Sequence, residues 1–192
     1  MTSAARTSKG LARAGFTLLE MVLVLVAIAV LGGGAITVMI LSSDERALGD
    51  ATSEVEALAK RARTIATLQQ RPYALEFREN QVHLMPLAEA LMEPDRREGV
   101  AEALEAGAKL EGSRFSSERQ SWAAEEGMQI SVRRWASEEF LPTNGKVRQI
   151  WRFDPEGPCE PITIHFQMEK SWAEAEFNPL TAAIRDLTQE IY

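Results

Sequence analysis

Residues 15–41 read GFTLLEMVLVLVAIAVLGGGAITVMIL, and this stretch decides how the rest of the chain is organised. The 21 residues from Met21 to Leu41 carry no charge, and as a helix they extend about 31 Å. The hydrocarbon core of a bilayer is about 30 Å thick. We therefore expect residues 16–41 to form a helix that spans a membrane.

One carboxylate, Glu20, lies at the start of this apolar run. An ionisable side chain inside a bilayer costs on the order of 3 kcal/mol unless it reaches the interface or finds a partner. Glu20 therefore needs either a place in the headgroup layer or a cation nearby.

The charges on the two sides of the span differ. Residues 1–15 contain three basic residues and no acidic one, whereas Asp44, Glu45 and Asp50 follow the span with only Arg46 against them. The positive-inside rule then predicts a cytoplasmic amino terminus, with everything after Leu41 on the far side. No A-x-A cleavage site follows the apolar run, so we expect the span to be retained.

The basic leader, Gly15, Phe16 and the segment Thr17–Met21 resemble the processing signature of type IV pilins and type II secretion pseudopilins. The resemblance implies that a prepilin peptidase removes residues 1–15 by cutting after Gly15 on the cytoplasmic face. It also implies that the new amino terminus, on Phe16, is methylated.

Cleavage would give Glu20 a partner. An α-amino group has a pKa of about 8 and is mostly cationic at pH 7, and within one helix Phe16 and Glu20 are close enough to meet. In the family, this glutamate is thought to neutralise the amine of a neighbouring subunit, which sets the axial stagger of the growing filament. The resemblance thus makes Glu20 an assembly residue, and a plain location in the headgroup layer is the alternative.

Gly32, Gly33 and Gly34 interrupt the apolar run, and each costs about 1 kcal/mol relative to alanine inside a helix. Related pilins lose helix in the corresponding region on assembly, so one reading is a weak point that melts locally. The other reading is close helix packing through small residues, such as Ala29 with Gly33. Both readings stay open.

An amphipathic pattern predicts that the helix continues over residues 42–71. Apolar residues recur at spacings of three and four, and no proline occurs between Phe16 and Pro72. A coiled-coil seam would give a similar stripe, but this one lasts only about three heptads and lacks strong core residues. We expect one helix to about Gln70 that packs on the chain's own sheet. The stripe consists of Leu48, Ala51, Val55, Leu58, Ala62 and Ile65.

Residues 72–192 change to the two-residue alternation of strands and predict a β-rich globular domain. The expected fold class is α+β: a long N-terminal α-helix whose second half packs on an antiparallel β-sheet domain. Residues 87–121 are charged and helix-favouring, and they predict an inserted helix and loop. The alternating runs predict a hairpin over residues 73–84, then strands around residues 128–132, 147–153 after the turn signal Pro142–Gly145, 162–168, 173–177 and 184–187.

This domain also resembles one branch of the family, the H-type minor pseudopilins and their relatives among minor type IV pilins. Two departures are visible: Ala182 stands where glycine is expected after Thr181, and the insertion after Pro86 is long and charged. The residues that carry the resemblance are Arg61, Ala62, Arg63 and Ala66 with the run Gln70–Phe77, then Phe153 and Pro155–Gly157, and last Asn178–Thr181.

The charge balance limits the partners. The chain has a formal net charge of −7, and without Arg6, Lys9 and Arg13 of the leader 18 basic residues stand against 28 acidic ones, a net −10. Such an acidic domain repels phosphate backbones. The last 25 residues, where a DNA-binding minor pilin would need a basic strip, hold two basic residues against five acidic ones. We therefore expect no nucleic-acid partner.

No motif predicts catalysis, a cofactor or a metal site. His83 and His165 stand alone in alternating strands and are expected to be exposed. Cys159 is the only cysteine, which excludes an intramolecular disulfide, and its acidic neighbours are expected to raise its pKa.

Related major pseudopilins bind calcium, but Glu125, Glu126, Glu138 and Glu139 are ordinary solvated charges before they are a calcium site. Trp122, Trp135, Trp151 and Trp172 suit core and sheet-face packing before a binding platform.

The resemblance therefore implies a minor pseudopilin, which is a structural subunit of the pseudopilus of a type II secretion system and not an enzyme. It would be a single-pass inner-membrane protein with a cytoplasmic amino terminus and a periplasmic domain. Its partners would be the prepilin peptidase, the major and other minor pseudopilins and the inner-membrane assembly platform. Two alternatives remain: a minor type IV pilin, and a membrane-anchored periplasmic domain of unknown activity.

Overall fold

The computed structural model describes residues 18–93, 96–97, 117–145 and 147–192, and within these it describes the side chains of all but residues 31–42. The leader, Gly15, Phe16 and much of the predicted insertion therefore lie outside the described residues. The chain divides into two units, Met1–Ile40 and Leu41–Tyr192, and each is described by itself.

A single helix, α1 (Leu18–Gln69), contributes residues to both units. Its end agrees with the prediction. Gln70 takes the left-handed conformation with φ +52°, Arg71 N donates to Ala66 O over 3.2 Å, and Pro72 follows. A left-handed residue with such a backbone bond is a common way to close a helix, and proline prevents it from resuming.

The strands of the second unit form two antiparallel sheets rather than the single sheet that we expected. Sheet A has the order β3-β2-β1-β6, and sheet B has the order β5-β4-β7-β8-β9. The strands of sheet A are β1 (Tyr73–Arg78), β2 (Gln81–Pro86), β3 (Gln120–Ala123) and β6 (Arg148–Phe153). Those of sheet B are β4 (Met128–Arg134), β5 (Leu141–Pro142), β7 (Ile162–Met168), β8 (Ser171–Phe177) and β9 (Ile184–Glu190).

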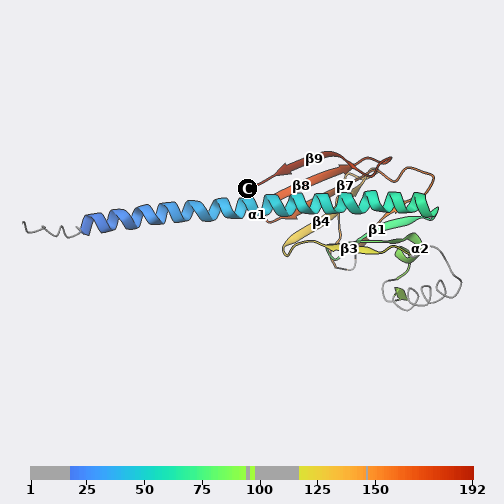
Figure 1. Cartoon of the computed structure of the whole chain (residues 1–192), viewed down its shortest axis with the longest axis horizontal. Helices are drawn as coiled ribbons and strands as arrows, with labels where there is room; N and C mark the ends of the chain where they lie inside the picture. Colours follow the sequence, from blue (N-terminus) through green and yellow to red (C-terminus); the bar gives the residue numbers. More distant parts are fainter. Residues whose placement is uncertain (1–17, 94–95, 98–116, 146) are drawn as a thin grey trace, which may run out of the picture. The chain divides into compact units, whose positions relative to one another are not determined.

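The predicted stripe of α1 joins the inner faces of both sheets in one hydrophobic core, so the expectation that it packs on the chain's own sheet is confirmed. In Figure 1, β1 and β3 lie along one side of this part of α1 and β8 and β9 along the other. Alanines on the stripe, such as Ala51 and Ala62, are fully buried and let the strands approach the helix closely. Trp151 lies at the centre, with ring centroids 4.6 Å from Phe153 and 5.1 Å from Phe177.

Two further strand predictions need correction. Gln120 and Ser121 belong to β3, not to the insertion; the side chains of β3 are polar or exposed apart from Trp122, so alternation does not reveal the strand. The segment Pro142–Gly145 is not a hairpin turn, because β5 pairs with β4 while β6 pairs with β1. The chain crosses there from sheet B to sheet A.

Strand β1 is buried on both faces, although its alternating sequence predicts one face toward water. Leu75 and Phe77 face α1, while Ala74 on the other face packs with Leu87 and Ala90. These last two belong to the short helix α2 (Leu87–Ala90), the described beginning of the insertion. Helix α2 therefore covers part of the outer face of sheet A, by which we mean the face away from α1.

Candidate functional site

The beginning of α1 carries an uncovered apolar surface. Ten large hydrophobic side chains between Leu18 and Val30 are 45–83% exposed. Large exposed apolar patches mark surfaces for proteins or membranes. In the part of the chain whose side chains the structure describes, no helical stretch is both long and apolar enough to cross a membrane. The members of this apolar surface are Leu18, Leu19, Met21, Val22, Leu23, Val24, Leu25, Val26, Ile28 and Val30.

The predicted processing and assembly residues are placed only in part. Gly15 and Phe16 lie outside the described residues. Glu20 is an exposed residue in the first turn of α1, on the same helix as the apolar surface. The backbone of residues 32–34 is helical, which leaves both readings of the three glycines as predictions.

Polar contacts fix the second half of α1 to the sheets. Ser171 Oγ donates to Asp44 Oδ2 over 3.1 Å, and the backbone N–H of Ile184 donates to Glu56 Oε1 over 2.9 Å. Burial alone would raise the pKa of Glu56, but its hydrogen bonds with Lys60 and Ile184 outweigh burial and lower it. The two contacts join α1 to the start of β8 and to the start of β9.

Arg63 connects α1 to the loop after β6. Its Nη1 donates to the carbonyl oxygen of Asp154 over 2.8 Å and also to that of Gly157. Asp154 precedes, and Gly157 ends, the Pro155–Gly157 segment on which the family resemblance partly rests. The role of Arg63 here is structural, because a guanidinium that satisfies two loop carbonyls holds the loop against the helix.

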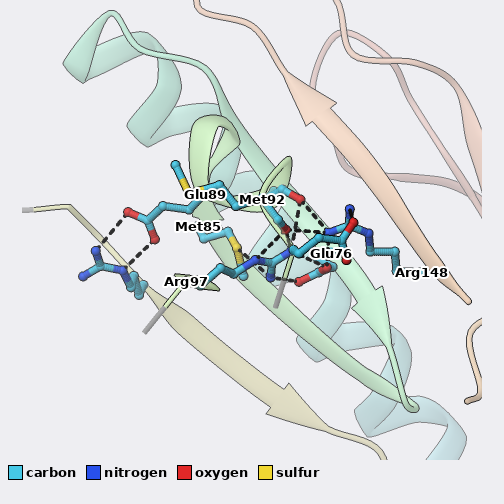
Figure 2. Close-up of polar contacts among 9 residues, drawn as sticks. Glu76, Met85, Glu89, Met92, Arg97 and Arg148 are labelled. Carbon is cyan, nitrogen blue, oxygen red and sulfur yellow. Dashed lines mark hydrogen bonds and ion pairs between the residues drawn. The ribbon is translucent and has the colours of Figure 1, made fainter. Parts of the chain in front are cut away.

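A charged cluster, which we call the Glu76 cluster, attaches the insertion to sheet A (Figure 2). Glu76 is completely buried, and Arg97 reaches both of its oxygens, with Nη2 at 2.8 Å from Oε1. Arg148 on β6 lies 3.6 Å from the same oxygen. Both arginines also donate to the carbonyl oxygens of Ala90 and Met92, over 2.8–3.2 Å. A buried carboxylate thus holds the chain just beyond α2 in place.

The electrostatics of the cluster follow from this geometry. Burial alone would raise the pKa of Glu76, but the hydrogen bonds and charge of Arg97, with the charges of Arg78 and Arg148, lower it below the ordinary value. The sequence does not reveal this cluster, because Glu76 occupies an alternating strand position that predicts exposure. Only the fold brings Arg97 and Arg148 to it.

A second ion pair holds the described residues that follow residues 98–116. Arg119 makes a two-pronged contact with Glu89 of α2, both distances being 2.9 Å, and Glu89 is only 6% exposed. The backbone N–H of Glu118 donates to Tyr73 Oη over 3.3 Å. The described residues on both sides of residues 98–116 are therefore attached to sheet A or to α2.

Both histidines lie in strands and have close neighbours. His83 lies opposite Glu76 in the β1–β2 pairing, and burial, together with the charges of Arg78 and Arg97, lowers its pKa although Glu76 acts the other way. His165 lies on the face opposite Ile164 and Phe166, as predicted. Both are half-buried rather than exposed, which corrects the prediction. The His165 ring stacks on Trp172 at 5.7 Å and lies 5.3 Å from Phe140.

Cys159 is a buried residue whose Sγ lies 3.1 Å from the carbonyl oxygen of Pro179. The pKa of its thiol is raised as predicted, but the cause is burial rather than acidic neighbours, and Arg63 opposes the effect. The tryptophans form no common platform: Trp151 is in the core, Trp122 packs against it, and Trp135 is 76% exposed. Within the described residues, no three His, Cys, Asp or Glu side chains gather where they could hold a metal ion.

Comparisons of the chain with protein-family models, with curated proteins and with solved structures gave no match.

Proposed function

We propose that this chain is a minor pseudopilin, a structural subunit of a periplasmic filament that serves a type II secretion system. The observation that carries the proposal is the apolar surface of α1, whose side chains between Leu18 and Val30 are exposed to between 45% and 83%. The same helix continues into a segment that packs on the sheets of the second unit. A helix that is apolar all round at one end and amphipathic at the other suits a subunit stored in lipid and then bundled with its neighbours.

In this proposal the apolar surface is first covered by lipid and later by the corresponding helices of other subunits. Transfer from one apolar environment to another leaves most of the hydrophobic free energy unchanged, so other interactions must decide the register. Glu20 supplies one, because its carboxylate would pair with the amine of Phe16 on a neighbouring subunit after cleavage. The sheets of the second unit would then contact other subunits or cargo.

The intact mass of the protein in membranes tests this proposal. Cells with and without a prepilin peptidase are compared, and a Gly15→Ala variant is examined alongside. We expect a product that begins at N-methylated Phe16, only where the peptidase is present and Gly15 is intact. An uncut chain, or a cut after Leu41, contradicts the proposal and leaves an anchored domain.

Glu20 provides the second test, because it separates processing from assembly. We expect Glu20→Ala to be cut normally and to be recovered from membranes but not from sheared filaments. The matched control is Glu54→Ala, which removes an exposed carboxylate from the second half of the same helix. Equal filament incorporation of the two variants would argue against the role of Glu20.

A further inference from the structure

Arg78, the last residue of β1, has an unsatisfied buried nitrogen. It follows Glu76 by two positions in the strand, so its side chain projects from the same face, the outer face of sheet A. Within the described part of the chain, Arg78 Nε is the buried side-chain nitrogen or oxygen without a hydrogen-bond partner. A buried donor that stays unpaired costs about 1–3 kcal/mol, so it calls for an acceptor.

The residue paired with Arg78 adds a second positive charge beside it. In the pairing of β1 with β6, Arg78 faces Arg148 directly. Like charges at directly opposed positions destabilise an antiparallel pair. Arg148 has oxygen acceptors in Ala90, Met92 and Glu93, with Glu93 Oε1 at 3.4 Å. In the part of the chain that the structure describes, Nε of Arg78 has no such acceptor.

Charged groups of both signs surround this pair among the described residues. Three guanidinium groups, those of Arg78, Arg97 and Arg148, act on the buried carboxylate of Glu76. Among the described residues, Glu89 and Glu93 also act on Arg97. Glu89 is paired with Arg119, and Glu93 has a side chain that is 74% exposed and 3.4 Å from Arg148. Among the described residues, Arg97 and Arg148 therefore form ion pairs with carboxylates, whereas Arg78 acts on Glu76 and its Nε has no hydrogen-bond acceptor.

We propose that Arg78, with Arg148 opposite it, binds a small oxyanion of the carboxylate or phosphate type on the outer face of sheet A. The guanidinium of Arg78 supplies the hydrogen bonds, because a planar fork of N–H groups matches two oxygens of such an anion. Arg148 keeps its carbonyl acceptors and supplies charge. Among the described residues Nε of Arg78 has no acceptor, and the bound anion would supply one. This site is independent of the filament role.

Two sources offer the same chemistry: a free phosphate, and the carboxylate of an acidic side chain on another protein. The test uses the full chain in maltoside micelles, with the ionic strength held constant by sodium chloride. Inorganic phosphate and sodium acetate are titrated separately, and the NMR signal of the Arg78 Nε–H group is followed. The spectrum of Arg78→Gln assigns that signal by its loss.

We expect a saturable shift of the Arg78 signal with at least one of the two anions. A tenfold or greater preference for phosphate assigns the site to a phosphate group, whereas similar affinities assign it to a carboxylate. In Arg78→Lys, which keeps the charge but loses the fork, the thermal stabilisation by the same anion should require at least tenfold more of it. The matched control is Arg152→Gln, which removes an arginine of the neighbouring strand β6 that is already paired with Asp154 at 2.6 Å. It should change the requirement less than twofold.

Absence of a saturable shift with both anions at constant ionic strength overturns the proposal. Equal stabilisation of the wild type and Arg78→Lys does so as well, since the fork would then contribute nothing. Arg78→Lys keeps the test valid if Arg78→Gln does not fold.

Discussion

Glu76 on β1 and Arg97 beyond α2 are separated by 21 positions in the sequence, yet Arg97 Nη2 lies 2.8 Å from Glu76 Oε1. The Glu76 side chain is completely buried and that of Arg97 is 13% exposed, so water screens this pair little. Through the same guanidinium, Arg97 holds the carbonyl oxygens of Ala90 and Met92. The pair therefore links strand β1 of the core to the beginning of the insertion.

Removal of the Glu76–Arg97 ion pair should strongly destabilise the second unit. We expect Glu76→Ala to lower the free energy of unfolding by about 3 kcal/mol or more, because it leaves two partly buried arginines without this carboxylate. Urea denaturation of the full chain in micelles, followed by tryptophan fluorescence, measures the change. Glu118→Ala is the control: its ion pair with Arg61 is about half exposed and should be worth less than about 1 kcal/mol. Similar losses for the two variants would refute this view of the cluster.

The stability of the second unit should decline in acid, and Glu76 should cause part of the decline. The pKa of Glu76 is lower in the folded chain than the ordinary value of 4.5. A lowered folded pKa contributes stability that is complete above the unfolded pKa and is lost as the pH falls through the folded one. Melting temperatures measured from pH 6 to pH 2 should therefore begin to fall near pH 4.5. Glu76→Gln should melt lower at pH 6 but lose less on acidification; an unchanged pH dependence would contradict the assignment.

Ala182 provides a prediction about backbone strain. It lies at φ +56° and is fully buried, in the turn where Ala182 N donates to Asn178 O over 2.9 Å. The left-handed conformation costs a residue with a Cβ roughly 1–2 kcal/mol, which glycine avoids. Ala182→Gly should therefore be close to neutral, because relief of strain offsets the lost methyl burial. Ala182→Val should be clearly destabilising, since β-branched residues rarely adopt positive φ.

Ala173→Gly is the control for the turn prediction. Ala173 is equally buried but lies within β8 and has no positive φ, so its replacement loses methyl burial and gains no relief. Chemical denaturation should rank Ala182→Gly above Ala173→Gly in stability by about 1 kcal/mol. The opposite order would show that strain at residue 182 is unimportant.

The thiol of Cys159 should be unreactive in the folded chain. Burial raises its pKa, and its sulfur lies 3.1 Å from the carbonyl oxygen of Pro179. Only the thiolate reacts readily, so both effects slow alkylation. Maleimide labelling at pH 7 should be at least a hundredfold slower in native protein than in guanidinium chloride. A Thr181→Cys variant, with an exposed residue in the same loop region, should label rapidly under native conditions; equally rapid labelling of Cys159 would rule out its burial.

Local patterns predicted several elements well. The apolar stripe from Leu48 to Ile65 predicted which face of α1 is buried, because helical periodicity and burial are directly linked. Pro72 predicted the end of the helix, since proline has no N–H to continue it. Alternation predicted the inward residues of β7 and β8, such as Ile164 and Ala175, whose strands have one face on the core.

The remaining structure depends on contacts that a local pattern does not encode. Alternation assigns a face to each residue of a strand but does not choose its partner strand, so two sheets appear where one was expected. Glu76 looked solvated because its cover comes from α2 and from Arg97, which are distant in sequence. The orphaned nitrogen of Arg78 is visible only once β1 and β6 are paired.

The sequence by itself determined the local features: the apolar run, the leader signature, the helical stripe and the alternation of most strands. Each depends on neighbours within a few residues, where geometry ties sequence spacing to direction in space. Only the tertiary structure decided the division into two sheets, the burial of Glu76 and the charge facing Arg78. These depend on which distant segments meet, because burial and electrostatics are set by everything that surrounds a group and not by its place along the chain.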